Sequence, residues 1–359
     1  MENIGGDVID FNFKGPEIIA HPQYDGVKEK ILEGLRDYDL KNHFILFSSG
    51  TTGGALKGYA ISKDALFANA SAVNKHFNLS KDDVWGLSLP SYHIGGLSVL
   101  ARAHLLQNKV LDVRGWEPHS WLEKIQDVTI TTIVPTQLYD LVKLGLKAPK
   151  KLRYIVVGGD FLSSELKKKA MELGWPVIRT FGMSEVCSQL ASARRPEEDD
   201  IQVMPIHQVK TNDEGRLMVK SEALFTLEFR LEDQLKVTLA KDLCIDGYYL
   251  TSDKAEIQGN TLKHLGRIGD EVKISGHLVS LLSLKDALGK YLIQNNIYGK
   301  MEITVQDDER TGKKLVLLIQ DDVLSQIDRV KEVLAPAKID KIIQVKDFNR
   351  TDLGKLKRI

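Results

Sequence analysis

From Phe44 onward, short apolar runs alternate with segments of helical spacing. The runs FILF, VWGLSLP, KVLDV, TTIVP, LRYIVVGG and VIRTFG are typical of strands, whereas residues 62–77 and the run GGLSVLARAHLLQ have helical periodicity, with Ser62 as the expected N-cap. This alternation predicts an α/β fold in which β-sheets are covered by helices. Ligands of such sheets bind at the carboxyl ends of the strands, and the glycine-rich and hydroxyl-rich segments of this chain fall there.

The pattern changes twice along the remainder of the chain. Residues 201–265 carry short β-like pieces separated by turn signals, which predicts a small β-rich subdomain. Beyond the run LGRIGDEVKISG, helices are expected over 283–294 and 323–334, with strands between them. A chain of 359 residues is long for one core. We therefore expect a large N-terminal domain over 1–268 and a small, mobile α+β domain over 269–359.

Composition narrows the classes of partner. Lysine plus arginine and aspartate plus glutamate both number 49, so no overall basic excess suggests nucleic acid or an anionic membrane as a partner. No apolar run is long enough to cross a bilayer, and the start of the sequence lacks the pattern of a signal peptide. The two cysteines, Cys187 and Cys244, form neither a disulfide framework nor a metal-ligand spacing, and they are expected to be inert. A cytoplasmic protein is expected.

The segment SSGTTGGALKG (48–58) has the composition of a phosphate-binding loop. Small residues let backbone N–H groups approach an anion, hydroxyls add donors, and Lys57 adds a charge. Such a loop commonly lies between a strand and a helix. The ATPase loop G-x-x-x-x-G-K-[ST] and the dinucleotide motif G-x-G-x-x-G are both absent. Taken alone, the segment remains open to a second interpretation, a flexible turn without a ligand.

Further segments, in order along the chain, resemble motifs of the adenylate-forming superfamily, which comprises acyl-CoA synthetases, luciferases and peptide-synthetase adenylation domains. They are SSGTTGGALKG, SLPSYHIGGL, IVVGGD, RTFGMSEVCSQ, YYLTSD, LGRIGDEVKISG and NRTDLGKLKR. Each match is weak by itself, and the ordered set is strong. The first segment departs from the family pattern because it has one extra residue before Lys57 and a leucine, Leu56, where proline is common.

The resemblance implies a reaction in two halves, with ATP, Mg²⁺ and coenzyme A as cofactor and cosubstrates. A carboxylic acid first reacts with ATP to give acyl-AMP, and a thiol then takes the acyl group. Glu185 is expected to hold Mg²⁺, for which hard oxygen ligands are suited, and Ser184 to contact the α-phosphate. The residues implied for the outer phosphates are Ser48, Ser49, Gly50, Thr51, Thr52, Gly53 and Lys57.

The nucleoside and the acid are assigned by the same resemblance. Asp253, taken as a carboxylate in a turn, is expected to accept from the ribose hydroxyls, with Arg267 assisting. Phe181 and Gly182, together with Gly158 and Gly159, are expected at the adenine. The residues implied for the acyl pocket are His93, Gly95, Gly96, Ser188 and Gln189.

Two residues of the C-terminal part complete the implied machinery. Lys355 is the cation expected to bridge the carboxylate and the α-phosphate during adenylation, which makes it the third catalytic residue beside Ser184 and Glu185. Gly269 stands at the position about which the family rotates its C-terminal domain between the two halves, and glycine permits a hinge there.

Within the superfamily, PSYHIGGLSVLAR and GMSEVCSQLAS are most similar to o-succinylbenzoate–CoA ligases of menaquinone synthesis, among which short forms occur. The spare carboxylate of that acid needs a cation or several donors, and Arg102, Arg179, Arg194, Ser188 and Gln189 are candidates. The segment before Ser48 is shorter than is usual, so an N-terminal subdomain is expected to be reduced or missing. The apolar surface thereby exposed predicts a possible homodimer.

Other interpretations remain open. The chain could be another acyl- or aryl-CoA ligase, a non-catalytic nucleotide-binding module, or a small-molecule kinase that releases ADP. Single residues also have structural alternatives. His93 could be a core histidine, Glu185 an acid at a helix N-terminus, Asp253 an ordinary turn aspartate, and Lys355 a solvated charge.

Overall fold

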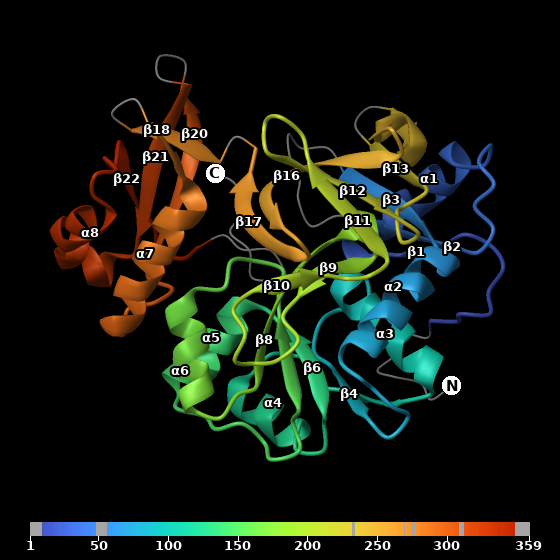
Figure 1. Ribbon diagram of the computed structural model, residues 1–359, viewed down its shortest axis with the longest axis horizontal. Helices are drawn as coiled ribbons and strands as arrows, with labels where there is room; N and C mark the ends of the chain where they lie inside the picture. The colour runs from blue at the N-terminus through green and yellow to red at the C-terminus, as the bar shows by residue number, and fades with distance from the viewer. Residues whose placement is uncertain are drawn as a thin grey trace.

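We analysed a computed structural model of the chain, which describes residues 9–47, 56–231, 234–268, 270–274, 277–308 and 312–348. Figure 1 shows a large sheet-rich body that holds the elements from β1 to β17, and a smaller unit beside it that carries the last helices and strands. The fold is mixed α/β, as the alternation of the sequence predicts. No helix in the described part of the chain is long and apolar enough to span a bilayer.

The central sheet begins as a parallel α/β layer. Its parallel strands are β4 (Val84–Leu87), β5 (Lys109–Asp112), β6 (Ile130–Ile133), β7 (Tyr154–Val157) and β8 (Val177–Met183). The helices that alternate with them are α3 (Ile94–Leu106), α4 (Pro118–Lys124), α5 (Pro135–Lys143) and α6 (Ser164–Glu172). The predicted strands and helices of this part are therefore confirmed.

Beyond β8 the same sheet continues with antiparallel strands. In spatial order they are β9 (Ser188–Ser192), β10 (Ile201–Val203), β17 (Thr261–Arg267), β16 (Tyr248–Gln258), β12 (Arg216–Ser221) and β11 (His207–Thr211), with β15 (Cys244–Ile245) on β16. The change of direction follows from the tight turn between β8 and β9, which contains the short 3₁₀ helix η3 (Ser184–Val186).

A second sheet is formed by segments from both ends of the large body. Its order is β1 (Glu17–Ile19), β2 (His43–Phe47), β3 (Leu56–Ser62), β13 (Leu227–Leu231) and β14 (Leu235–Leu239). Helices η1 (Pro22–Val27) and α1 (Lys28–Gly34) precede β2, α2 (Lys63–His76) follows β3, and η4 (Ala240–Leu243) follows β14. Ser62 caps α2, since its hydroxyl accepts from the Ala65 N–H at 3.1 Å, as predicted.

Strands from residues 201–265 thus contribute to both sheets. The short β-like pieces expected there are present, but β13 pairs with β3 and β14 pairs with β13, while the others extend the central sheet. The division of the chain at residue 268, and the β-rich subdomain over 201–265, stay predictions.

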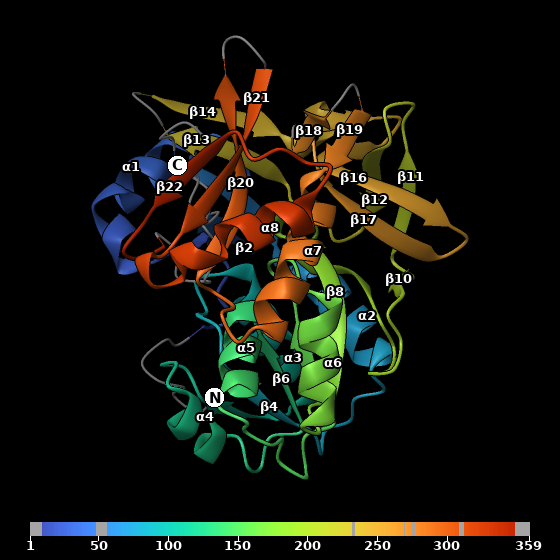
Figure 2. The ribbon, with the colours of Figure 1, turned by 90° about the vertical axis from the view of Figure 1, so that its left-hand side faces the viewer.

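The C-terminal unit is built around helix α7 (Leu281–Gln294) and a sheet of β20 (Met301–Asp308), β21 (Gly312–Ile319) and β22 (Lys341–Gln344). The remaining elements are the hairpin β18 (Glu271–Ile274) and β19 (His277–Ser280), η5 (Asp321–Gln326) and α8 (Ile327–Leu334). Figure 2 shows α7 lying beside α5 and α6. The Lys169 ammonium of α6 donates to the Ile293 carbonyl of α7 at 3.3 Å, and Tyr139 of α5 packs against Tyr298, with ring centroids 4.3 Å apart.

Buried apolar side chains hold these layers together. One core lies between the central sheet and α2 and α3 and includes Trp85, and another contains Trp121 and Trp175 below the parallel strands. The C-terminal unit has its own core on α7, β20 and β21. Full burial of such large rings supplies much of the driving force for folding. The two cysteines are free thiols, and burial raises the pKa of Cys187, in agreement with an inert role.

Candidate functional site

The expected phosphate loop connects two strands that pair with each other. β2 ends at Phe47, β3 begins at Leu56, and the two are antiparallel with Phe47 opposite Gly58. The loop thus lies between two strands, and β3 separates it from the expected helix α2. Ser48, Ser49, Gly50, Thr51, Thr52 and Gly53 lie outside the described residues, so their assignment stays a prediction.

Lys57 lies on β3 and is held by an acid. Its ammonium is 2.9 Å from a carboxylate oxygen of Glu228 on β13 and 5.0 Å from the centre of the Tyr59 ring. The Glu228 side chain is only 9% exposed, and the side chain of Lys57 is 26% exposed. The ion pair fixes the position of the Lys57 ammonium at the start of β3, and a phosphate there would compete with Glu228 for it.

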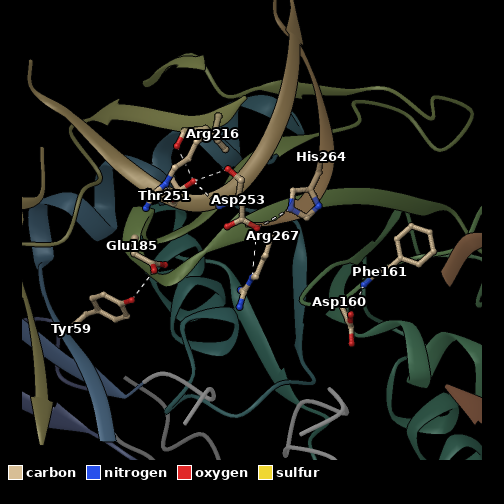
Figure 3. Close-up of polar contacts among 10 residues, drawn as sticks. Tyr59, Asp160, Phe161, Glu185, Arg216, Thr251, Asp253, His264 and Arg267 are labelled. Atoms are coloured by element: carbon tan, nitrogen blue, oxygen red, sulfur yellow. Dashed lines mark hydrogen bonds and ion pairs between the residues drawn. The ribbon is translucent and has the colours of Figure 1, made fainter. Parts of the chain in front are cut away.

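Glu185 is positioned by a tyrosine that the sequence analysis missed. The Tyr59 hydroxyl donates to Glu185 Oε1 at 2.7 Å, as Figure 3 shows. Burial, with the neighbouring carboxylate of Glu185, raises the pKa of Tyr59, so this hydroxyl remains a donor at all ordinary pH values. Tyr59 lies two residues after Lys57 and therefore on the same face of β3. That spacing was the signal available in the sequence.

The surroundings of Glu185 suit a magnesium ion that is also bound by phosphate. The side chain is half-buried and follows β8 within η3. In the described part of the chain, no group of three or more acidic, histidine or cysteine side chains could hold a metal ion. A carboxylate is a hard oxygen ligand of the kind that Mg²⁺ accepts when it is also bound by phosphates.

Asp253 lies on β16 and not in a turn, so the turn assignment is wrong. It faces Arg267 across the β16–β17 pair and is buried, with 9% of its side chain exposed. Its Oδ1 is 2.8 Å from His264 Nε2 and 3.7 Å from Arg267 Nε. Figure 3 shows the carboxylate pointing toward the side chains of His264 and Arg267. The acceptor expected for the ribose thus exists, and its orientation is set mainly by His264, which sequence reasoning did not identify.

Phe181 is linked to Asp253 through the same histidine. The rings of Phe181 and His264 are stacked, with centroids 4.5 Å apart and planes 27° apart. Gly158 and Gly159 follow β7, the strand beside β8, and Gly159 has a φ of +85°, which favours glycine. The described residues that the sequence assigned to the nucleoside therefore lie on two pairs of neighbouring strands, β7 with β8 and β16 with β17, or at their ends.

The turn between β8 and β9 is tight and strained. Cys187 and Ser188 have φ values of 60° and 111°, which are unusual for residues other than glycine. A Cβ at Gly182 would collide with the Ser188 carbonyl oxygen. Asn69 of α2 is fully buried and donates to the carbonyls of Val186 at 2.9 Å and Gln189 at 2.8 Å. These bonds fix the turn that carries Ser184, Glu185 and Ser188.

Ser188 faces a buried arginine. The Arg102 guanidinium of α3 donates to Ser188 Oγ at 3.3 Å, and the Ser98 hydroxyl donates to the same oxygen at 3.2 Å. Arg102 is 1% exposed, and its Nε has no hydrogen-bond partner within the described residues. No carboxylate of the described residues forms an ion pair with it, and burial lowers its pKa to about 9. An uncompensated buried cation of this kind is suited to an anionic ligand.

The other acyl-pocket candidates lie near the start of α3 and on β9. His93 is the N-cap residue of α3 and packs against Tyr92, with ring centroids 4.8 Å apart. A Cβ at Gly96 would collide with the Pro90 carbonyl, and a Cβ at Gly95 would lie 3.0 Å from Leu89 Cδ1. Gln189 donates to Thr180 Oγ1 at 3.0 Å, and it is buried. Gly269 and Lys355 lie outside the described residues.

Comparison with known proteins places this geometry in context. The profile of a family described as AMP-binding enzyme matches residues 39–221. The 2-succinylbenzoate–CoA ligase of Staphylococcus epidermidis is 29% identical over 330 residues, covering 88% of this chain and 68% of that enzyme. The enzyme of the same name from Bacillus cytotoxicus is 28% identical over 286 residues, with 72% of this chain and 57% of that enzyme covered.

Solved structures with the same fold include two o-succinylbenzoate–CoA synthetases. The Bacillus subtilis enzyme MenE in complex with the acyl-adenylate OSB-AMP has a TM-score of 0.72 and 22% identity, with 87% of this chain and 67% of that chain covered. The R195K variant of Escherichia coli MenE with bound OSB-AMS has a TM-score of 0.69 and 18% identity, with 84% and 64% covered. The mixed α/β architecture is that of these adenylate-forming enzymes.

Proposed function

Because the chain belongs to the AMP-binding enzyme family, we propose that it is an ATP-dependent, AMP-forming acid–thiol ligase. Its acid is o-succinylbenzoate and its product o-succinylbenzoyl-CoA, an intermediate of menaquinone synthesis. The names of the most similar relatives support this substrate. The chain spans only 68% and 57% of the length of the two curated relatives described above, so the activity of the whole enzymes is carried over here as a proposal.

The observation that carries the proposal is the buried cation beside the strained turn. Among the candidates for the spare carboxylate, Arg194 is exposed and Arg179 is only partly buried, whereas Arg102 is fully buried with Ser188 as its hydrogen-bond acceptor. A guanidinium can bind a carboxylate through two parallel hydrogen bonds. We assign Arg102 and Ser188 to that carboxylate, which favours a dicarboxylic acid over a simple aryl or fatty acid.

The nucleotide would be bound on the other side of the same turn. Glu185 and the phosphates would share Mg²⁺, which neutralises charge at the reacting phosphorus when it is bound. Asp253 would accept from the ribose hydroxyls, and Phe181 would cover the adenine. The described residues fit these roles, since one carboxylate is held by Tyr59 and the other by His264.

The reaction follows from bringing these groups together. A carboxylate oxygen of the acid attacks the α-phosphorus of ATP, the bond from that phosphorus to the bridging oxygen breaks, and pyrophosphate leaves. The thiolate of coenzyme A then attacks the acyl carbon of the mixed anhydride, and AMP leaves. Positioning and electrostatic stabilisation supply the rate enhancement in the first half.

Lys355 and Gly269 have roles in the exchange between the two halves. We propose that the Lys355 ammonium neutralises the attacking carboxylate and the α-phosphate during adenylation. Rotation of the C-terminal unit about Gly269 then removes the lysine and admits the thiol. The family resemblance of NRTDLGKLKR and LGRIGDEVKISG supports both assignments.

A panel of carboxylic acids tests the proposal. The protein is incubated with ATP, Mg²⁺ and coenzyme A, and AMP release is measured for o-succinylbenzoate, benzoate, malonate and fatty acids. Release with o-succinylbenzoate alone supports the substrate. Release with another acid means a different acyl- or aryl-CoA ligase, ADP in place of AMP means a kinase, and failure of any acid to stimulate pyrophosphate exchange leaves a nucleotide-binding module.

We also propose how the chain assembles and where it is located. A homodimer would cover apolar residues such as Phe13 and Leu32, which are 46% and 38% exposed near the N-terminal sheet. Light scattering that gives the mass of one chain would refute it. The free cysteines, and the supply of ATP and coenzyme A, support a cytoplasmic location.

A further inference from the structure

A histidine outside the family-like motifs connects two parts of the nucleotide site. His264 lies on β17, three residues before Arg267 and opposite Ala255 of β16. Its Nε2 is 2.8 Å from Asp253 Oδ1, and its ring stacks on Phe181. The side chain is 24% exposed, so it lies at the surface of the sheet and not in the core.

The bond from His264 to Asp253 limits how that carboxylate can rotate. Nε2 faces an acceptor and therefore carries the proton, whether or not the imidazole is charged. The donated bond uses one lone pair of Oδ1 and leaves the second carboxylate oxygen for other donors. Arg267 restrains the same oxygen less than His264 does, since the Arg267 Nε is 3.7 Å from Oδ1 and the Arg267 side chain is 57% exposed.

The stack with Phe181 limits a second side chain. Two rings at 4.5 Å with planes 27° apart are close to an offset stack, an arrangement that stabilises both orientations. One face of the Phe181 ring is thereby covered, and a purine has to use the opposite face. His264 thus sets the positions of an acceptor for the ribose and of a platform for the base together.

We propose that His264 is a positioning residue for the nucleotide, which fixes the ribose acceptor Asp253 through Nε2 and supports the adenine platform Phe181 through its ring. The inference rests on the proposed function, since it assumes that ATP binds between these residues. It predicts that the two effects can be separated by substitutions that keep only one of them.

Two variants separate the hydrogen bond from the stack. Glutamine in His264→Gln keeps an N–H donor of similar reach but has no ring, whereas phenylalanine in His264→Phe keeps a ring but has no donor. Lys263→Ala is the matched control, because Lys263 is the neighbouring residue on the opposite face of β17 and pairs with Glu256 at 3.0 Å. Calorimetry measures the Kd of the full-length proteins for ATP, 2′-deoxy-ATP and adenine.

We expect H264F to bind ATP less tightly than the unchanged protein does. The ratio of its Kd for 2′-deoxy-ATP to its Kd for ATP should fall at least about fivefold, because the carboxylate that accepts from the ribose hydroxyl is then poorly oriented. H264Q should keep that preference and bind adenine about threefold more weakly, because the platform is unsupported. K263A should match the unchanged protein in all three measurements.

An unchanged preference of H264F for ATP over 2′-deoxy-ATP would overturn the inference, since His264 would then not orient Asp253. Tighter ATP binding by either variant would also overturn it, since His264 would then hinder ATP binding. The proposed function fails in a different way. If the unchanged protein does not bind ATP, or binds ATP and 2′-deoxy-ATP equally, the nucleotide site itself is wrongly assigned. A normal ribose preference in the unchanged protein with no response to either substitution refutes the role of His264 alone.

Discussion

Replacing Arg102 by methionine is expected to make the protein more stable and less able to bind its acid. The guanidinium is 1% exposed, and burial alone lowers its pKa to about 9, against about 12.5 for arginine in water. At 1.36 kcal/mol for each pKa unit, the charged form is disfavoured by about 5 kcal/mol in the folded protein. Loss of the Ser188 hydrogen bond and of packing against Trp85 offsets part of this, and we expect Arg102→Met to gain about 1–4 kcal/mol.

Thermal unfolding with and without o-succinylbenzoate measures both effects. In a domain of 150–250 residues, about 1 kcal/mol moves the midpoint by about 2–4 °C, so R102M should melt several degrees higher without ligand. Acid at 100 times its Kd should stabilise the unchanged protein by about 2.7 kcal/mol and should leave R102M nearly unaffected. The same experiment with Arg194→Met, at an exposed arginine, is the control and should show the behaviour of the unchanged protein.

The pH dependence of the free energy of unfolding gives an independent check that Arg102 destabilises the folded protein. Arg102 has a folded-state pKa below its unfolded value, so the unfolded state binds the proton more tightly. The destabilisation is complete below about pH 9 and is relieved as the pH rises above that value. The difference in stability between R102M and the unchanged protein should therefore narrow above pH 9. A variant that is less stable than the unchanged protein without ligand, or one that the acid stabilises equally well, would refute the reasoning.

Three further substitutions test other parts of the protein: two test the proposed active site, and the third tests a buried histidine. Lys355→Ala should abolish pyrophosphate exchange and leave thioester formation from supplied acyl-AMP within about twofold, and equal loss of both halves would contradict its role. Glu185→Ala should raise the KM for Mg-ATP at least about tenfold, since it removes one carboxylate ligand. The variant should still fold, with a modestly lower melting midpoint because the Tyr59 hydroxyl loses its acceptor, and collapse of the melting transition would favour a structural role. His207 has a pKa lowered to about 4 by burial, so stability should fall by about 3 kcal/mol as the pH drops from 6.5 to 4. In His207→Gln, the urea midpoint should change less between pH 6.5 and pH 4. An unchanged slope of the midpoint against pH would contradict the assignment of this loss of stability to His207.

The sequence predicted the α/β layer because local signals determine it. Each strand from β4 to β8 is a short apolar run bounded by turn residues, and each helix between them has helical spacing. Ser62 could be identified as a cap because a hydroxyl before a helix has one obvious partner, the N–H of Ala65. The expected C-terminal helix over 283–294 likewise begins with Leu281 after the Ser280 cap.

Pairing between distant strands could not be predicted in the same way. Residues 201–265 show turn signals and alternation, but alternation does not specify a neighbour. β13 finds its partner in β3, more than 160 positions earlier, because Phe229 and Leu227 complete the core around Phe47 and Ile45. Long-range pairing depends on which apolar faces remain uncovered after local folding.

The motif residues of the site were predictable, and the residues that orient them were not. Glu185 and Asp253 were identified by resemblance, whereas their partners Tyr59 and His264 belong to strands outside or at the margin of those motifs. The Tyr59–Glu185 bond spans 126 positions. His264 is only 11 positions from Asp253, but a bulge between Lys254 and Ala255 changes the register, so counting along the two strands does not bring them together.

The strained turn would allow the proposed acid and nucleotide sites to share one short segment. Phe181 lies on β8, Glu185 follows in η3, and Ser188 then turns back toward Arg102. A chain of ordinary conformation could not reverse within Cys187 and Ser188, and both have positive φ. Asn69 makes that geometry stable by bonding the carbonyls on either side. Strain at this turn therefore places the group proposed to bind the spare carboxylate a few residues from the carboxylate proposed to hold Mg²⁺, so that one short segment would bring an acid close to a phosphate.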